Sequence, residues 1–159
     1  METWLAEVFE PAIKLLAAVI VGALVGINRD LHGKPAGLRL CALVALGSGL
    51  ITVITNEPRL GFTDPSSVSR AIQGIVGGIG FLGAGVILHQ SAGSRIRNLT
   101  TAATIWMSAA LGIACGLGAW RTGGVAAILA LIVLSLGARI DRALFGRFAG
   151  EDDLGPDNV

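Results

Sequence analysis

The sequence predicts an all-α membrane protein, a polytopic bundle of about five transmembrane helices. Of its 159 residues, 53% are hydrophobic and only 14% are charged, whereas a soluble domain usually carries about 25% charged residues. So little polar surface cannot keep a globule of this size in water. The apolar residues also gather in five long runs, which hold a single charged residue, Lys14. Runs of about 20 apolar residues are typical of membrane-spanning helices.

The five runs fix the predicted order of elements along one domain. They cover residues 11–27, 40–55, 71–88, 99–118 and 123–137, and the segments between them hold nearly every proline and charge. The runs are apolar on every face, which favours helices over the alternating strands of a β-barrel. We assign residues 1–148 to one transmembrane helical domain and expect the acidic residues 149–159 to be disordered.

Basic residues predict the orientation of the bundle. If the N-terminus faces away from the cytoplasm, eight of the 12 lysines and arginines lie on the cytoplasmic side and four lie outside. This distribution follows the positive-inside rule and places the C-terminus inside. The net charge of +1 gives no electrostatic basis for binding nucleic acid, so lipid and other membrane helices are the expected partners.

Small residues at four-residue spacing predict close contacts between helices. Lipid supplies no hydrophobic force between helices, and such rows let two backbones approach closely. The rows are Ala18, Gly22 and Gly26 in the first run and Cys41, Ala45 and Gly49 in the second.

The third run is dense in glycine. Each helical glycine costs about 1 kcal/mol relative to alanine, so several of them need a compensating contact. We therefore expect this run at the centre of the bundle with neighbours on two sides; the alternative is a hinge. Three of its glycines match the dinucleotide fingerprint G-x-G-x-x-G, but the required strand and acidic residue are missing, and we expect no cofactor. The glycines assigned to close packing are Gly74, Gly77, Gly78, Gly80, Gly83 and Gly85.

A stripe of polar and small residues lies along the fourth run. At 100° per residue, its members fall within an arc of about 120°. The hydroxyls can bond to carbonyls one turn back and join helices, or they can line a path for water or an ion. The stripe comprises Thr100, Thr101, Thr104, Ser108, Gly112 and Cys115.

Charged residues at the ends of the runs are functional candidates, because charge near lipid is costly unless it is paired or hydrated. Arg29, Arg39 and Arg70 qualify, and Asp64 is close enough to Arg70 for an ion pair. Snorkelling anchors are the alternative interpretation. No aspartate or glutamate lies within any run, so the chain has no obvious site for coupling to a cation.

The sequence does not predict an enzyme. Its two histidines, His32 and His89, lack metal-ligand or triad spacing with cysteine, aspartate or glutamate, and we expect both to be solvated loop residues.

Three blocks of sequence resemble the MgtC/SapB family of bacterial membrane proteins. The first is Gly26-Ile-Asn-Arg29 with Lys34-Pro-Ala-Gly-Leu-Arg39, the second runs from Arg70 to Ile87, and the third is Leu99 to Trp106 with Gly116-Leu-Gly118. The resemblance implies an inner-membrane helical bundle linked to magnesium homeostasis or adaptation to low magnesium, with Mg²⁺ as a candidate ligand or substrate. It also implies that some relatives are virulence factors acting on other membrane proteins, including the ATP synthase.

The chain departs from the family pattern at three positions. Asn28 stands where the family usually has glutamate, Leu40 replaces a common threonine, and Asn98 replaces a usual glycine. The missing glutamate removes an acid that could meet a cation, which weakens the case for direct transport. Longer relatives add a soluble C-terminal domain, which we expect this chain to lack.

These observations leave two functional hypotheses. We favour a membrane protein of magnesium adaptation that binds itself or another membrane protein through glycine-rich faces. The alternative is a transporter or channel for magnesium or another small ion along the hydroxyl stripe. The candidate positions are Asn28, Arg29, Arg39, Asp64, Arg70, Thr100, Thr101, Thr104, Trp106 and Ser108.

Overall fold

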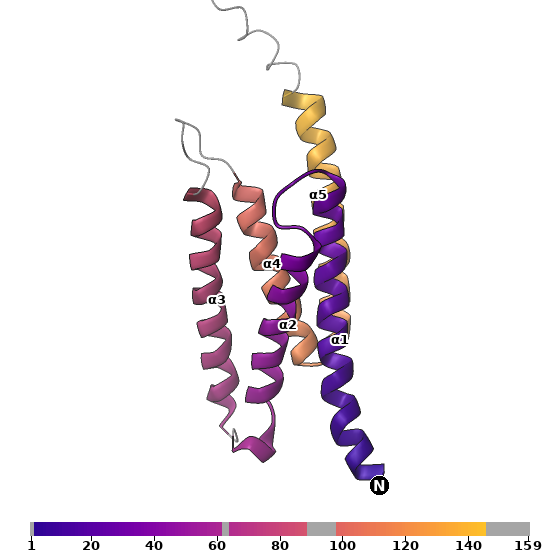
Figure 1. Cartoon of the computed structure of the whole chain (residues 1–159), viewed down its shortest axis with the longest axis vertical. Helices are drawn as coiled ribbons and strands as arrows, with labels where there is room; N and C mark the ends of the chain where they lie inside the picture. Colours follow the sequence, from indigo (N-terminus) through magenta and orange to yellow (C-terminus); the bar gives the residue numbers. More distant parts are fainter. Residues whose placement is uncertain (1, 62–63, 89–97, 146–159) are drawn as a thin grey trace, which may run out of the picture.

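The computed structural model describes residues 2–61, 64–88 and 98–145. These residues form five long helices, each running antiparallel to the next along the chain (Figure 1). All five are long and apolar enough to cross a membrane, which confirms the predicted fold class. The predicted acidic tail, residues 149–159, lies outside the described residues. The elements are α1 (Glu2–Leu31), α2 (Leu38–Thr55), the 3₁₀ turn η1 (Pro58–Leu60), α3 (Pro65–Leu88), α4 (Leu99–Gly116) and α5 (Trp120–Phe145).

Several helices extend beyond the apolar runs that predicted them. Helix α1 begins well before Pro11 and α3 begins six residues before Ala71. An apolar run marks the part of a helix compatible with lipid, whereas backbone hydrogen bonding continues until a cap ends it. For α3 that cap is Asp64, which accepts a hydrogen bond from the Ser66 amide at 3.0 Å and precedes a proline at the first helical position.

Helix α4, not α3, occupies the centre of the bundle. It packs against each of the other four helices, and over half of its residues are buried. Helix α3 stands at one side (Figure 1) and, in the described part of the chain, contacts only α4 and α2. The expectation that the glycine-rich third run lies at the centre is therefore wrong for the single chain, although the run does contact two helices. It is also a continuous helix rather than a broken one.

The two predicted rows of small residues do form close helix contacts. A Cβ added at Gly22 would lie 2.6 Å from the Cys41 carbonyl oxygen and 2.7 Å from the Ala45 Cβ, so α1 and α2 meet backbone to backbone. Gly26 approaches the Leu38 backbone in the same way. Ala18, Cys41 and Ala45 are fully buried. Close approach of α1 and α2 holds the ends of both helices in place around the site described next.

Candidate functional site

The site is built around a buried arginine at the C-terminal end of α1. Arg29 is only 6% exposed. Its Nη2 donates a hydrogen bond to the Thr101 hydroxyl of α4 at 2.6 Å and contacts the Pro35 carbonyl oxygen at 3.4 Å. Its Nε is buried and has no partner among the described residues. The guanidinium therefore lies inside the protein with hydrogen bonds but no carboxylate beside it in the described part of the chain.

Local backbone geometry brings Arg29 and Thr101 together. Helix α1 ends and α4 begins at the same end of the bundle, because the chain crosses it twice in between, down α2 and back along α3 (Figure 1). Asn98, just before α4, has a φ of 68°. This left-handed region favours glycine, and asparagine is among the few other residues that tolerate it. Asparagine at this position is thus compatible with the conformation that starts α4.

Asn28 connects α1 to α5 beside the arginine. Its Nδ2 donates to the Ser135 hydroxyl at 2.9 Å. The Nδ1 of His32 lies 2.7 Å from the Asn28 carbonyl oxygen, so this nitrogen carries the ring hydrogen and donates. Asn28 therefore acts as a structural crosslink between α1 and α5.

A cavity of about 760 Å³ opens at this end of the bundle. Helices α1, α4 and α5 contribute to its walls, together with the turn after α1. Its polar lining carries two cations and several hydrogen-bonding groups, and α5 supplies an apolar wall. Among the described residues that line it, none has a carboxylate. The lining includes Asn28, Arg29, His32, Lys34, Asn98, Thr100, Thr101, Val133, Leu134 and Gly137.

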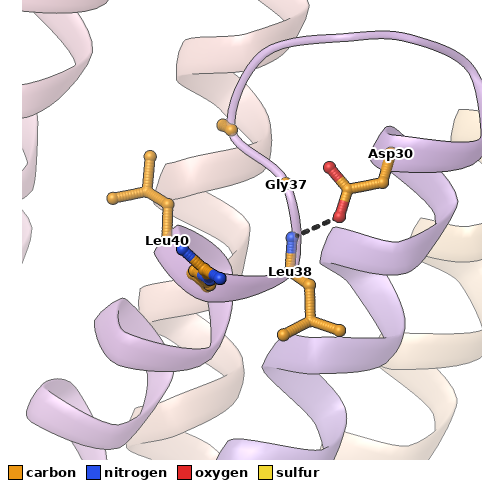
Figure 2. Close-up of a pocket in the computed structure, with 6 residues that line it drawn as sticks. Asp30, Gly37, Leu38 and Leu40 are labelled. Carbon is orange, nitrogen blue, oxygen red and sulfur yellow. Dashed lines mark hydrogen bonds between the residues drawn. The ribbon is translucent and has the colours of Figure 1, made fainter.

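The turn between α1 and α2 is locked by Asp30. Its Oδ2 accepts a hydrogen bond from the Leu38 amide at 2.9 Å, which caps the first turn of α2 (Figure 2). Gly37 lies directly against this carboxylate, and any side chain there would overlap it. Arg39 and Leu40 line a second, shallower pocket of about 560 Å³ at this turn, and both are exposed. Asp30 is thus committed to the helix cap and not to the buried arginine.

Removing this cap should destabilise the turn. We expect Asp30→Ala to lower the free energy of unfolding by about 0.5–2 kcal/mol, because the Leu38 amide loses its acceptor. Asp30→Asn keeps an acceptor oxygen and should lose less. Thermal unfolding in detergent would measure both, and equal stability of Asp30→Ala and wild type would contradict the cap.

Asp64 and Arg70 lie at the opposite end of the bundle. They form the expected ion pair, with Arg70 Nη2 3.5 Å from Asp64 Oδ2, and both side chains are exposed. Hydrogen bonds from the Ser66 hydroxyl and amide hold the pKa of Asp64 below its ordinary value, and the Arg70 cation adds to this. The cap therefore contributes stability above the unfolded-state pKa of about 3.9 and loses it as the pH falls through the lower folded-state value.

The hydroxyl stripe of α4 is mostly buried. The Thr104 hydroxyl donates to the Thr100 carbonyl at 2.7 Å, and the Ser108 hydroxyl donates to the Thr104 carbonyl at 2.9 Å. Thr101, Thr104 and Ser108 are nearly inaccessible, whereas Thr100 is exposed at the cavity. Trp106 is 47% exposed on the outer side of α4. This pattern favours helix packing over a continuous hydrated path.

The glycine face of α3 is largely uncovered. A Cβ added at Gly74, Gly77, Gly78, Gly80 or Gly85 would have no neighbour within 4 Å in the described part of the chain. Gly83 alone among the six faces a helix, with the Ala102 Cβ 3.5 Å from an added Cβ. Within the single chain, the described residues therefore supply no close-packing partner for five of the six glycines, and their predicted role stays a prediction.

Sequence reasoning missed part of the cavity. It placed Arg29 at a run boundary without preferring it to Arg39 or Arg70, both of which are exposed. His32 is an exposed turn residue, as predicted, but its place at the cavity was not predicted, and Lys34 was given no role. The helix order could have predicted this grouping, since antiparallel helices place the end of the first run and the start of the fourth at the same end of the bundle. His89 lies outside the described residues.

Within residues 2–61, 64–88 and 98–145, no group of three or more histidine, cysteine, aspartate or glutamate side chains is placed to hold a metal ion. Both cysteines, Cys41 and Cys115, are free and buried. Thus the conspicuous polar chemistry of the described bundle is cationic, and it gathers at the Arg29 end.

Fold and site together define a multi-pass helical membrane protein with a buried arginine beside a polar cavity. The sequence pattern of the MgtC family matches residues 15–143, so the chain belongs to the MgtC family. This confirms the family resemblance of the three sequence blocks.

Curated relatives agree with this membership. Protein SrpB of Synechococcus elongatus is 41% identical over 148 residues, which are 88% of this chain and 81% of SrpB. Protein MgtC of Salmonella typhimurium is 43% identical over 123 residues, which are 77% of this chain and 50% of that protein. Protein MgtC of Brucella abortus is 39% identical over 122 residues, with 49% of its length covered. The chain thus spans about half the length of these MgtC proteins. No solved structure matches it.

Proposed function

We propose that the chain is an inner-membrane protein, N-terminus out and C-terminus in, that serves adaptation to low magnesium by helix–helix interaction. Its partner is a second copy of itself or another membrane protein. The proposal involves no enzymatic step. Membership of the MgtC family supports the link to magnesium, and the open glycine face of α3 is the observation that supports the mode of action.

Four glycines of α1 and α4 are covered, in contrast to the face of α3. Gly22, Gly26, Gly112 and Gly116 all press against neighbouring backbones. On α3, by contrast, several glycines cost about 1 kcal/mol each relative to alanine, and no contact within the described chain offsets that cost. A helix docked on this face would supply the missing contacts, since small residues are the means by which membrane helices approach.

The shape of the face suits a second copy. Phe81 is 81% exposed, and at 100° per residue it shares the face with Gly77, Gly78 and Gly85, one turn away on either side. A protruding ring flanked by hollows is self-complementary, as a two-fold interface requires. Beside it, α2 and α3 form an apolar groove of about 610 Å³ lined by Gly74 and Gly78.

Site-specific photo-crosslinking tests this proposal. A photoreactive residue at Leu82, which is 44% exposed on α3, should capture a second, differently tagged copy in the membrane. Gly78→Leu fills the hollow and should reduce the captured product about tenfold or more, as for loss of an interface anchor. Gly124→Leu is the matched control, because an added Cβ at this α5 glycine also has no described neighbour within 4 Å.

The crosslinking result distinguishes self-association from binding of another membrane protein. A captured second copy supports self-association, whereas capture of one defined membrane protein, lost in Gly78→Leu, supports the other partner class. Growth in low-magnesium medium of a strain lacking the gene should be restored by the wild type and by Gly124→Leu but not by Gly78→Leu. No captured product, or the same product in both variants, would refute the interaction.

Transport is the second candidate function. One observation favours it: the cavity beside Arg29 reaches Thr100 and Thr101 at the start of the hydroxyl stripe. Against it, Thr104 and Ser108 are buried and bonded within their own helix. Purified protein in liposomes should show no flux of magnesium above empty vesicles if interaction is the function; flux abolished by Thr104→Val would support transport instead.

A further inference from the structure

We propose that the cavity beside Arg29 binds a phosphate-bearing anion, either free phosphate or the phosphate of a lipid headgroup. This binding site is additional to the helix-docking face of α3. It is carried by the buried guanidinium, whose Nε has no partner among the described residues, and by the composition of the cavity around it.

The charges that line the cavity favour an anion. Arg29 and Lys34 contribute two cations, and no described lining residue contributes a carboxylate. The nearest acid in sequence, Asp30, is occupied by the Leu38 amide. A cation buried without a counter-charge is costly, and one of its hydrogen-bond donors is unused. An oxyanion in the cavity would supply the missing counter-charge.

The start of α4 adds a second source of positive potential. The first backbone N–H groups of a helix have no partners within that helix, and the helix dipole concentrates positive potential there. Thr100 and Thr101, in the first turn of α4, line the cavity and carry hydroxyl donors as well. Phosphate groups bind readily at such helix ends, especially when arginine supplies its planar fork of N–H groups.

The apolar wall strengthens this preference. Val133 and Leu134 of α5 close one side of the cavity, which lowers the local polarity and lengthens the reach of the two cations. The cavity lies at an end of the bundle, where α1 finishes and α4 begins, rather than at mid-bundle (Figure 1). Both a dissolved phosphate and a headgroup phosphate reach such a position.

Binding is tested with two probes on the purified full chain in detergent. The first is inorganic phosphate, titrated against chloride at equal ionic strength while the thermal unfolding midpoint is followed. The second is phosphatidylglycerol, counted by native mass spectrometry against phosphatidylcholine. A saturable rise of the midpoint identifies free anion, and retention of phosphatidylglycerol alone identifies a lipid headgroup.

Asn28→Glu is the decisive variant. Glutamate places a carboxylate in the cavity and can still accept a hydrogen bond from the Ser135 hydroxyl, so we expect it to stabilise the fold while weakening anion binding about tenfold or more. Asn28→Gln is its neutral, size-matched control and should retain binding. Lys34→Gln should weaken binding, whereas Arg121→Gln, an exposed cation at the opposite end, should leave it unchanged.

These variants also separate a binding role from a structural one. A structural role alone would make stability and binding change together, whereas the proposal requires Asn28→Glu to move them in opposite directions. The proposal is overturned if neither probe binds, or if binding survives Asn28→Glu, or if Arg121→Gln lowers it equally. None of these outcomes depends on whether α3 docks a partner.

Discussion

Replacing Gly112 with alanine is expected to destabilise the bundle by about 3 kcal/mol or more. A Cβ at this position of α4 would overlap the Ala45 carbonyl oxygen and lie 2.8 Å from the Ala45 Cα. The obstacle is backbone, so no side chain can move aside, and helices α2 and α4 would have to separate. Overpacking of this kind costs about 1–3 kcal/mol in tolerant sites and more where the structure cannot relax.

The measurement is denaturant-induced or thermal unfolding of the purified protein in detergent. Gly124→Ala is the matched control, because an added Cβ there meets no described neighbour within 4 Å. Helix propensity should raise the stability of that variant by about 0.5–1 kcal/mol. A Gly112→Ala protein as stable as Gly124→Ala would show that α2 and α4 do not approach as described.

Changing Thr101 to valine should cost about 1.5–3 kcal/mol, the second largest effect that we expect. Valine keeps the shape of the side chain but removes the hydroxyl that accepts the 2.6 Å hydrogen bond from Arg29. The charge then remains buried with only the distant Pro35 carbonyl as a named partner. Hydrogen bonds to charged groups contribute more than neutral ones, and an unsatisfied buried donor adds a desolvation penalty.

Two further variants isolate this interaction. Thr104→Val also removes a buried α4 hydroxyl, but one bonded to its own helix, so it should cost less than about 1 kcal/mol. Combining Thr101→Val with Arg29→Met should cost less than the sum of the single changes, because methionine removes the unpaired charge. Strict additivity in this double-mutant cycle would mean that the two side chains do not interact in the membrane protein.

The two ends of the bundle differ in chemistry in a way that bears on both proposals. At the opposite end, Arg70 and Asp64 are exposed and paired with each other, so they anchor a helix and a turn. At the Arg29 end one cation is buried, and the described residues give it no acid. A ligand is proposed at the Arg29 end because the buried cation has no acid beside it among the described residues. The glycine face of α3 lies elsewhere on the molecule. It lacks packing partners among the described residues.

Much of the fold could be predicted from the residues alone. The five apolar runs became the five helices, since hydropathy sums over neighbours in the chain and needs no tertiary information. Rows at four-residue spacing lie on one face of any helix, so Gly22 and Ala45 could be recognised as contact positions before their partners were known. The pairing of Asp64 with Arg70 could also be predicted, because they lie only six positions apart in the sequence.

Other features depend on which helices become neighbours, and chain-local patterns do not contain that information. Glycine density marks α3 as able to pack closely, yet α4 took the centre because its own small and hydroxyl residues meet four helices at once. Arg29, Arg39 and Arg70 look equivalent at the ends of apolar runs. Only Arg29 is buried, because Thr101, 72 positions along the chain, folds back beside it. Periodicity assigns residues to a face of a helix, whereas the burial of that face is set by contacts among segments far apart in the chain.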